Sequence, residues 1–194
     1  MSRSAALGAL SPVASEQWGM VTAGQARRLE VSRTDLSRLV ADGVLAEVEG
    51  AARVYRFVAA PENPDLDPLR AAWLQLGGER YWHERIAGID AVVCGRSAAL
   101  VWGLGDLIPV RHEFLAPHRL RPRRVDIHVA VRASLGRSDF EIRDGLPVTG
   151  VLATLTDLAH AGEDETAVAQ AASDASLRGL VAFDAVSELL LTVR

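Results

Sequence analysis

The sequence predicts an α+β protein: an N-terminal winged helix–turn–helix followed by a mixed α/β C-terminal domain with a small sheet and flanking helices. Three observations predict this fold. Two short helices with separate N-terminal caps follow one another, a β-hairpin pattern comes next, and later segments alternate between strand and helix periodicity. The predicted domains are residues 1–60 and 61–194. Residues 59–68, with three prolines and three acidic residues, are the predicted linker.

The first predicted helix covers residues 4–18. Its apolar residues have mainly helical spacing: Leu7, Leu10, Val13, Ala14 and Trp18. Pro12 is expected near a kink, or in the first turn of a new helix that begins after Ser11. Residues 19–21 are expected to break the helix.

Two capping boxes predict the helix–turn–helix. Thr22 is followed three residues later by Gln25, and Ser32 is followed three residues later by Asp35. In such a box the hydroxyl accepts from the third backbone amide, and the third side chain reaches back to the cap. The predicted helices are 23–30 and 33–42, with Gly43 as the C-terminal cap. Strands 44–49 and 53–58 then complete the order of a winged helix.

Helices and strands mix in the rest of the chain. Asp67 and Pro68 are predicted to be the N-cap and first residue of a helix that buries Leu69, Ala72, Trp73 and Leu76. Further helices are predicted at residues 97–104, 150–160, 165–177 and 185–193, the last capped by Asp184. Strand-like alternation appears at residues 113–116, 124–132 and 140–143.

The second helix of the motif has one apolar face, formed by Leu36, Leu39 and Val40. The opposite side carries the predicted base-reading residues: Arg33, Thr34, Ser37, Arg38 and Ala41. Arginine pairs with guanine, hydroxyls contact bases or phosphates, and an alanine methyl can meet thymine. The predicted phosphate contacts are Thr22, Arg27, Arg28, Ser32, Arg53 and Arg56. The alternative is a winged helix used only for packing or protein contact.

Charge is distributed unevenly along the chain. Residues 1–60 carry seven arginines and six acidic residues, residues 61–150 carry twelve of each, and residues 151–194 carry two arginines and seven acidic residues. The sequence has no lysine. A net charge of +1 in the first segment is a weak electrostatic signal for DNA binding. No run has membrane-span length, no leader is recognised, and the single cysteine suits a reducing compartment, so we expect a cytoplasmic protein with no membrane partner.

A second basic patch is predicted in the segment 117–132, from Arg119, Arg121, Arg123 and Arg124. This cluster has two interpretations. It is either a solvated turn that enters a half-buried strand, or a surface for DNA phosphate or for an RNA-bound or acidic partner.

No enzyme chemistry is expected. Asp126 and Glu141, with Arg143 nearby, resemble the acidic pair of metal-dependent nucleases, but those sites use a lysine and this sequence has none. Metal-ligand spacing is absent among the histidines His83, His112, His118, His128 and His160. Cys94 is expected to be a small buried residue rather than a nucleophile. We therefore expect no catalytic residue, metal site or cofactor, and surface charge is the simpler interpretation of the acidic pair.

Three segments together resemble the AbiEi family of antitoxins from bacterial type IV toxin–antitoxin systems: residues 19–58, 94–107 and 144–159. The second is similar to the family's Ser-Ala-Ala-x-x-x-Gly-Leu helix. The third is similar to its Gly-(Leu/Ile)-Pro-Val-Thr segment and the Thr-Leu-x-Asp-Leu-Ala helix that follows. The chain departs from many members at residues 94–97, where Cys-Gly-Arg-Ser replaces a small hydroxyl-His-Arg-Ser run.

The resemblance implies a two-domain repressor and antitoxin. Its winged helix would bind double-stranded DNA at inverted repeats in its own promoter. Binding as a dimer and cooperative binding are both options. Its C-terminal domain would counteract a nucleotidyltransferase-like toxin, directly or functionally. Carried onto this sequence, the recognition helix is 33–41 and the wing is about 47–56. The alternative is an interaction module that neutralises its toxin by direct contact, without specific DNA binding.

Overall fold

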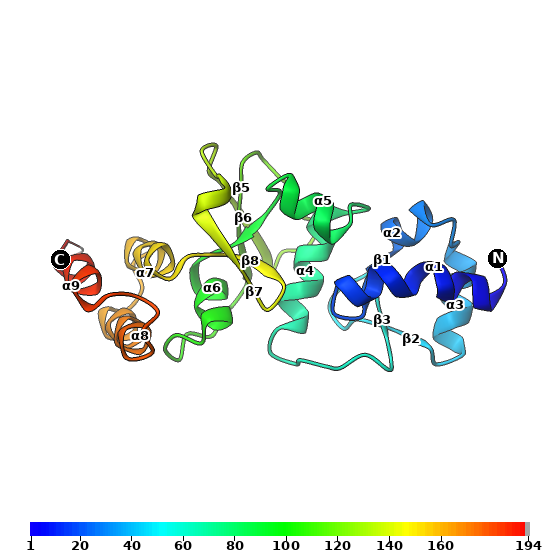
Figure 1. Cartoon of the computed structure of the whole chain (residues 1–194), viewed down its shortest axis with the longest axis horizontal. Coiled ribbons are helices and arrows are strands. Elements are labelled where there is room, and N and C mark those ends of the chain that lie inside the picture. Colours follow the sequence, from blue (N-terminus) through cyan, green and yellow to red (C-terminus); the bar gives the residue numbers. More distant parts are fainter. Residues whose placement is uncertain (193–194) are drawn as a thin grey trace. The chain divides into compact units, whose positions relative to one another are not determined.

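A computed structural model describes residues 1–192 and divides the chain into two compact units, Met1–Asp90 and Ala91–Arg194. The first unit contains α1 (Arg3–Glu16), β1 (Met20–Thr22), α2 (Ala23–Arg28), α3 (Arg33–Ala41), β2 (Leu45–Glu47), β3 (Val54–Phe57), α4 (Asp67–Gly77) and α5 (Trp82–Ala87) (Figure 1). Its sheet has the order β1-β3-β2, with antiparallel pairing throughout. Helix, strand, helix–turn–helix and hairpin follow one another as in a winged helix. The predicted α+β class is confirmed.

Helix α1 is continuous through Pro12 and ends at Glu16, two residues before the predicted end. It ends because Trp18 and Gly19 adopt positive φ angles, 57° and 78°, which are incompatible with a continuing right-handed helix. Residues 20–22, expected only as a break, form β1. All three are buried, so the strand has no polar–apolar alternation that sequence reasoning could detect.

The division between the units follows Asp90, thirty residues after the predicted boundary at 60/61. Helix α4 packs against β1 and β3, and the rings of Trp18 and Trp73 meet edge to face with centroids 6.2 Å apart. Residues 59–68 are therefore a loop inside the first unit rather than a linker between domains. Helix α4 starts at Asp67 and takes Leu66 as its N-cap, one residue before the predicted cap.

A buried amide pair ties α5 to the rest of this unit. Gln17 Nε2 donates to Gln25 Oε1 at 3.0 Å, and Gln25 Nε2 donates back to Gln17 Oε1 at 2.8 Å. Gln25 also donates to the carbonyl of Arg80 at 2.8 Å, and the amide of Trp82 donates to Gln17 at 3.2 Å. Helix α5 was not predicted, and these bonds explain its position.

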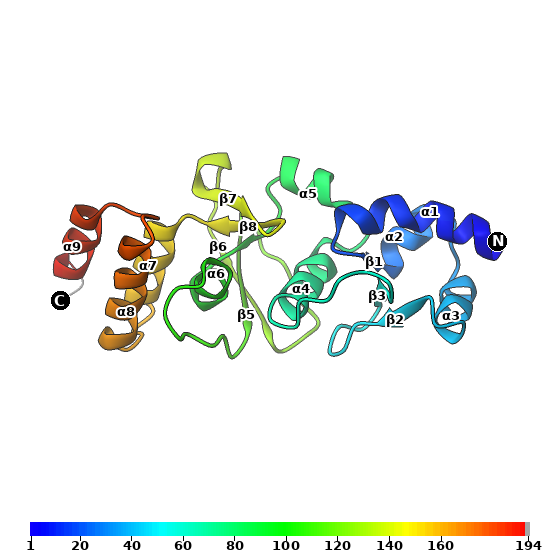
Figure 2. The same cartoon turned by 60° about the horizontal axis from the view of Figure 1, so that its bottom comes forward.

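The second unit has a five-stranded mixed sheet of order β6-β5-β4-β8-β7 (Figure 2). Its strands are β4 (Val92–Val93), β5 (His112–Ala116), β6 (Ile127–Val131), β7 (Phe140–Arg143) and β8 (Leu146–Thr149). Pairs β4/β8 and β5/β6 are parallel, and pairs β4/β5 and β7/β8 are antiparallel. Strand β6 starts three residues after the prediction, and β8 was not predicted as a strand.

The helices of this unit are α6 (Gly95–Trp102), α7 (Val151–His160), α8 (Glu165–Leu177) and α9 (Phe183–Thr192). The prediction for α8 is confirmed, and Asp164 caps it by accepting from two backbone amides. Helix α9 begins at Phe183, so Asp184 lies in its first turn rather than at its cap. The predicted last residue of that helix, 193, lies outside the described residues. Helices α7, α8 and α9 pack on one another (Figures 1 and 2).

Candidate nucleic-acid interface

Helices α2 and α3 each begin at a complete capping box. Thr22 Oγ1 accepts from the amide of Gln25 at 3.1 Å, and Gln25 Oε1 accepts from the amide of Thr22 at 2.9 Å. At α3 the corresponding bonds between Ser32 and Asp35 are 3.2 and 3.1 Å. Both boxes predicted from the sequence are confirmed, and each satisfies amides that a helix start otherwise leaves unbonded.

The turn between α2 and α3 is anchored to the core of the unit. Glu30 takes a left-handed conformation with φ 61°, and the amide of Val31 donates to the carbonyl of Ala26 at 2.9 Å. Val31, Leu36 and Leu39 are each at most 2% exposed. Helix α3 therefore has its apolar side in the core and its orientation fixed at its first turn.

The opposite side of α3 carries the predicted base-reading residues, and all are exposed: Arg33, Thr34, Ser37, Arg38 and Ala41. Arg38 has 70% of its side chain exposed, and its Nη1 lies 3.8 Å from Asp35 Oδ1. The hydrogen bond from Ser32 lowers the pKa of Asp35, so this carboxylate stays charged as part of the cap. The contact with Arg38 is too long for a hydrogen bond and leaves the guanidinium available.

The arginines predicted to contact phosphates differ in whether they are paired with an acidic residue in the structure. Arg27 pairs with Glu79 at 2.6 Å, and Arg28 makes two bonds to Glu84, of 2.7 and 2.9 Å. Arg56 is paired with Glu62. Three of the four predicted arginines are thus already neutralised by acidic residues that lie 6 to 56 positions away along the chain.

The start of α2 is covered by the turn between α4 and α5. Thr22 Oγ1 donates to the carbonyl of Gly78 at 2.6 Å, and a Cβ added at Gly24 would lie 2.8 Å from that same carbonyl oxygen. Thr22 is itself buried and its hydroxyl is bonded, so it is not free to contact a phosphate. The Ser32 hydroxyl donates to Asp35 at 2.6 Å and is likewise occupied.

The wing is the turn between β2 and β3, and its tip is attached to α4. Gln75 Nε2 donates to the carbonyl of Ala52 at 2.8 Å. Arg53 follows with φ 66° and an exposed side chain. The exposed Glu47 and Glu49 lie on the same hairpin, so Arg53 is the residue through which this wing can contact a phosphate.

The arginines separate into two groups when their partners are compared. Within residues 1–192, most hydrogen-bond or pair with carboxylates or backbone carbonyls. Five have neither kind of partner in that described part of the chain: Arg33, Arg53, Arg119, Arg121 and Arg123. Two of these belong to α3 and the wing, and three belong to the second predicted basic patch.

The fourth residue of the predicted second patch, Arg124, differs from the others. It is half-buried and forms a two-pronged pair with Asp126, one bond of which is 2.8 Å. Burial, and next the positive charge of Arg124, lower the pKa of the neighbouring His112. Arg124 therefore belongs to the start of β6 rather than to an open basic surface.

The acidic pair considered for a nuclease is not assembled. Asp126 precedes β6, and Glu141 lies on β7, at the opposite edge of the five-stranded sheet. Among residues 1–192, no group of three or more histidine, cysteine or acidic side chains is placed to hold a metal ion. The two carboxylates thus cannot act on one substrate atom.

Cys94 lies at the start of α6 and is buried. Burial raises the pKa of its thiol, and the carboxylates of Asp157 and Glu113 raise it further, which disfavours the reactive thiolate. The Glu113 carboxylate instead caps this helix by accepting from the amide of Arg96 at 2.8 Å. The departure from the family pattern at residues 94–97 therefore falls at the start of α6, which is capped by Glu113 from β5.

The Arg28–Glu84 pair gives an acid-range prediction. Its hydrogen bonds lower the pKa of Glu84 from 4.5 to about 2, so the pair contributes stability above pH 4.5 that is lost as pH falls toward 2. The stability difference between wild type and Glu84→Gln should shrink over that interval, as measured by urea unfolding at successive pH values. Glu49→Gln, which removes an exposed wing carboxylate, is the control. A constant difference for Glu84→Gln across the interval would contradict the prediction.

No helix within residues 1–192 combines the length and the hydropathy that crossing a membrane requires.

Comparisons with known proteins agree with this description. The crystal structure of the RV2827C protein from Mycobacterium tuberculosis is similar in fold, with a TM-score of 0.50, 20% identity, and coverage of 95% of this chain and 71% of that one. A search of curated proteins gave no match. Residues 9–49, which include both capped helices, match the family model described as "Transcriptional regulator, AbiEi antitoxin". Over this segment, the chain is similar to the AbiEi antitoxin family of transcriptional regulators.

Proposed function

We propose that this protein is a sequence-specific DNA-binding repressor of its own operon and the antitoxin to a nucleotidyltransferase-like toxin encoded beside it. The proposed role is non-enzymatic, needs no cofactor and places the protein in the cytoplasm. The observation that carries it is the exposed side of α3. Five side chains suited to bases or phosphates share this side, and the helix beneath them is fixed by a capping box and a buried apolar face.

Sequence is read on α3, and the wing positions the protein. Arg38 can pair with a guanine edge, and Thr34 and Ser37 offer hydroxyls beside it. Arg53 extends from the wing and can hold a phosphate without discriminating between bases. The pairing of Arg27, Arg28 and Arg56 with carboxylates reduces the charge available for non-specific binding. The proposed complex therefore relies on few phosphate contacts from this unit.

Replacing Arg38 by alanine tests base reading. We expect the variant to lose about 1–3 kcal/mol of binding free energy on a duplex taken from directly upstream of the reading frame, and little on a scrambled duplex of equal length. Fluorescence anisotropy at several salt concentrations gives both values. Arg53→Ala should instead weaken both duplexes alike and reduce the salt slope by about one.

Arg27→Ala is the matched control, because Arg27 is 77% exposed, lies in the same unit and is paired with Glu79 rather than with a residue of α3. Equal affinity of the wild-type protein for the upstream and scrambled duplexes would rule out specific reading.

A second candidate function is toxin neutralisation by direct contact without specific DNA binding. It is favoured by the acidic residues of the segment 151–194, which would suit a basic toxin surface. Co-purification of the full chain with the adjacent gene product, beside the anisotropy assay, separates the two candidates. An Arg38→Ala variant that loses operator preference yet still neutralises the toxin would assign the two activities to different surfaces.

A further inference from the structure

Strand β6 forms one edge of the five-stranded sheet, and the outer side of this strand is open. In the sheet order β6-β5-β4-β8-β7, β6 comes first. Among residues 1–192, β5 is the only strand that pairs with it. An unpaired edge presents backbone amides and carbonyls to which another strand can bond.

The backbone groups of β6 divide between the two sides of the strand. The carbonyl of Asp126 accepts from the amide of His112 at 2.7 Å. The amide of Arg132 donates to the carbonyl of Ala116 at 2.9 Å. Backbone groups alternate in direction along a strand, so the even-numbered residues of 126–132 face β5. The odd-numbered residues between them point their amides and carbonyls to the open edge: Ile127, Val129 and Val131.

The apolar row on the core side of the sheet is only partly covered at β6. Phe114 and Ala116 of β5 are 0% exposed. Their register partners on β6 are Val129, which is half-buried, and Val131, which is 56% exposed. Register partners lie on the same face of a sheet. A further strand beside β6 would therefore cover these two valines.

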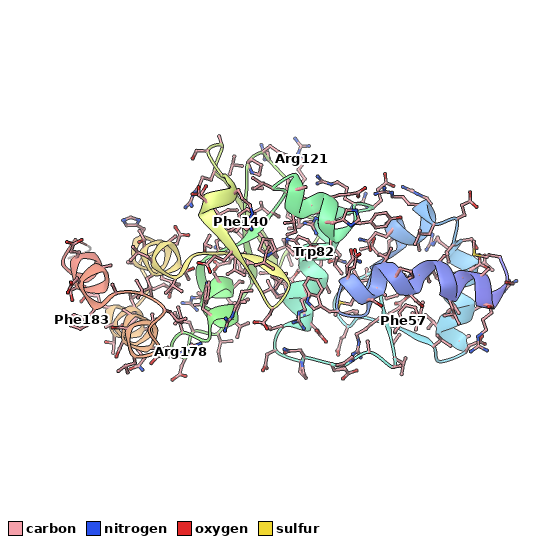
Figure 3. All side chains as sticks on the ribbon, in the orientation of Figure 1. Phe57, Trp82, Arg121, Phe140, Arg178 and Phe183 are labelled. Carbon is pink, nitrogen blue, oxygen red and sulfur yellow. The ribbon has the colours of Figure 1, made fainter. Side chains whose placement is uncertain are left out.

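The two edges of the sheet differ in their protection against pairing. Residues 127–131 contain no proline, arginine or acidic residue. The other edge strand, β7, begins at Phe140, which is labelled in Figure 3. Two of its four residues, Glu141 and Arg143, are charged and exposed. Charged side chains on an edge strand oppose pairing, so β6 is the edge that suits a further strand.

We propose that β6 pairs in antiparallel register with β6 of a second copy of this chain, about a twofold axis at Val129. In this register the two Val129 residues form a hydrogen-bonded pair, and Ile127 lies opposite Val131 of the second copy. These three residues present the outward backbone groups that such a ladder requires. The same edge is used on both copies, so the assembly closes as a dimer.

Charge complementarity favours a second copy as the occupant of this edge. The register places Asp126 opposite Arg132 of the second copy, and the twofold axis repeats this contact at the other end of the ladder. The Asp126 side chain is 41% exposed and that of Arg132 is 36% exposed, although each already has a partner within its own chain. No like charges face one another between residues 126 and 132.

This interface is argued from the second unit alone and does not depend on DNA binding. A twofold dimer carries two copies of α3. Under the proposed function, that number matches an operator built from two inverted half-sites.

The oligomeric state of the full chain tests the interface, by sedimentation equilibrium over a range of protein concentrations. Wild type is expected to be a dimer in reversible equilibrium with the monomer. Val131→Lys should shift this equilibrium to the monomer, because lysine on an edge strand opposes pairing. Ile142→Lys is the matched control, since it makes the same kind of change on β7 at a side chain that is 39% exposed. It should leave the equilibrium unchanged, and circular dichroism melting checks that each variant is folded.

A pair of introduced cysteines tests the register. A twofold axis at Val129 places His128 opposite Ala130 of the second copy, as a non-hydrogen-bonded pair with Cα atoms about 4.5 Å apart. This separation suits a disulfide, so His128→Cys/Ala130→Cys should give a covalent dimer on oxidation with diamide. Neither single variant should, because identical residues at these positions lie about 7–8 Å apart in this register.

Each outcome supports or overturns the interface. A monomeric wild type would overturn it, and so would a dimer that persists in Val131→Lys or a double-cysteine variant that does not cross-link. A monomeric wild type whose co-purification with the adjacent gene product is lost in Val131→Lys would assign the edge to that protein and overturn the second copy. Equal affinity of the dimer for the upstream and scrambled duplexes would reject the repressor and leave this interface intact.

Discussion

Replacing Asp90 by alanine is expected to lower the free energy of unfolding of the first unit by about 3–5 kcal/mol. Asp90 is 2% exposed and Arg85 is 1% exposed. Arg85 Nε donates to Asp90 Oδ2 at 2.6 Å, and the guanidinium carbon lies 3.5 Å from the ring centroid of Trp73. Burial lowers the pKa of Arg85 to about 10. Without Asp90 this cation remains buried and loses its charge partner.

The double variant Arg85→Met/Asp90→Ala tests why Asp90→Ala destabilises the unit. It distinguishes the loss of a charge partner for Arg85 from the loss of side-chain packing. One guanidinium nitrogen of Arg85 and one carboxylate oxygen of Asp90 make no hydrogen bond within residues 1–192. An apolar replacement of both should therefore recover much of the stability that Asp90→Ala loses. Arg80, which also contacts Asp90, is 43% exposed and can turn to water. Urea unfolding of the three proteins gives the comparison, and equal destabilisation in the single and double variants would contradict it.

Leu36→Ala is expected to destabilise the same unit by about 2–5 kcal/mol and to weaken binding to the upstream duplex. Leu36 is 1% exposed and lies in one apolar cluster with Leu10, Leu39 and Leu45. The cavity left by truncation would lie directly beneath the exposed side of α3. Because Thr34 and Ser37 depend on that helix for their position, specific binding should fall more than non-specific binding.

Leu177→Ala is the matched control, since it makes the same chemical change at a side chain that is 83% exposed. It should change stability by less than about 0.5 kcal/mol. Circular dichroism melting and anisotropy on both duplexes give the two readouts. A Leu36→Ala protein as stable as the control would mean that α3 is not anchored through this residue.

The helix–turn–helix could be predicted because its signals are local. A capping box needs only residues i and i+3, so Thr22 with Gln25 and Ser32 with Asp35 predicted both helix starts. The exposed side of α3 followed from helical spacing in the same way. Strands β1 and β8 were missed because each is buried throughout, and a buried run of three or four residues does not distinguish a strand from a helix.

The availability of the arginines could not be predicted, because it depends on contacts between distant parts of the chain. Arg28 and Arg53 are the same residue type within one predicted domain. Arg28 is paired with Glu84, 56 positions away, whereas Arg53 has no such partner within residues 1–192. No periodicity or composition identifies that difference. The domain boundary was misplaced for a similar reason, since the bonds from Thr22 and Gln25 to residues 78–80 are invisible along the sequence.

Those bonds also determine the smallest fragment that keeps the candidate DNA-binding unit intact. Ending the chain at residue 60 would expose Gln17 and Gln25 to water and leave β1 without the helix that packs on it. A fragment that extends through Asp90 keeps the amide pair, the α4–α5 turn and the Arg85 ion pair together. Domain swaps and reporter fusions that aim to move the proposed operator preference to another effector domain should therefore be joined after residue 90.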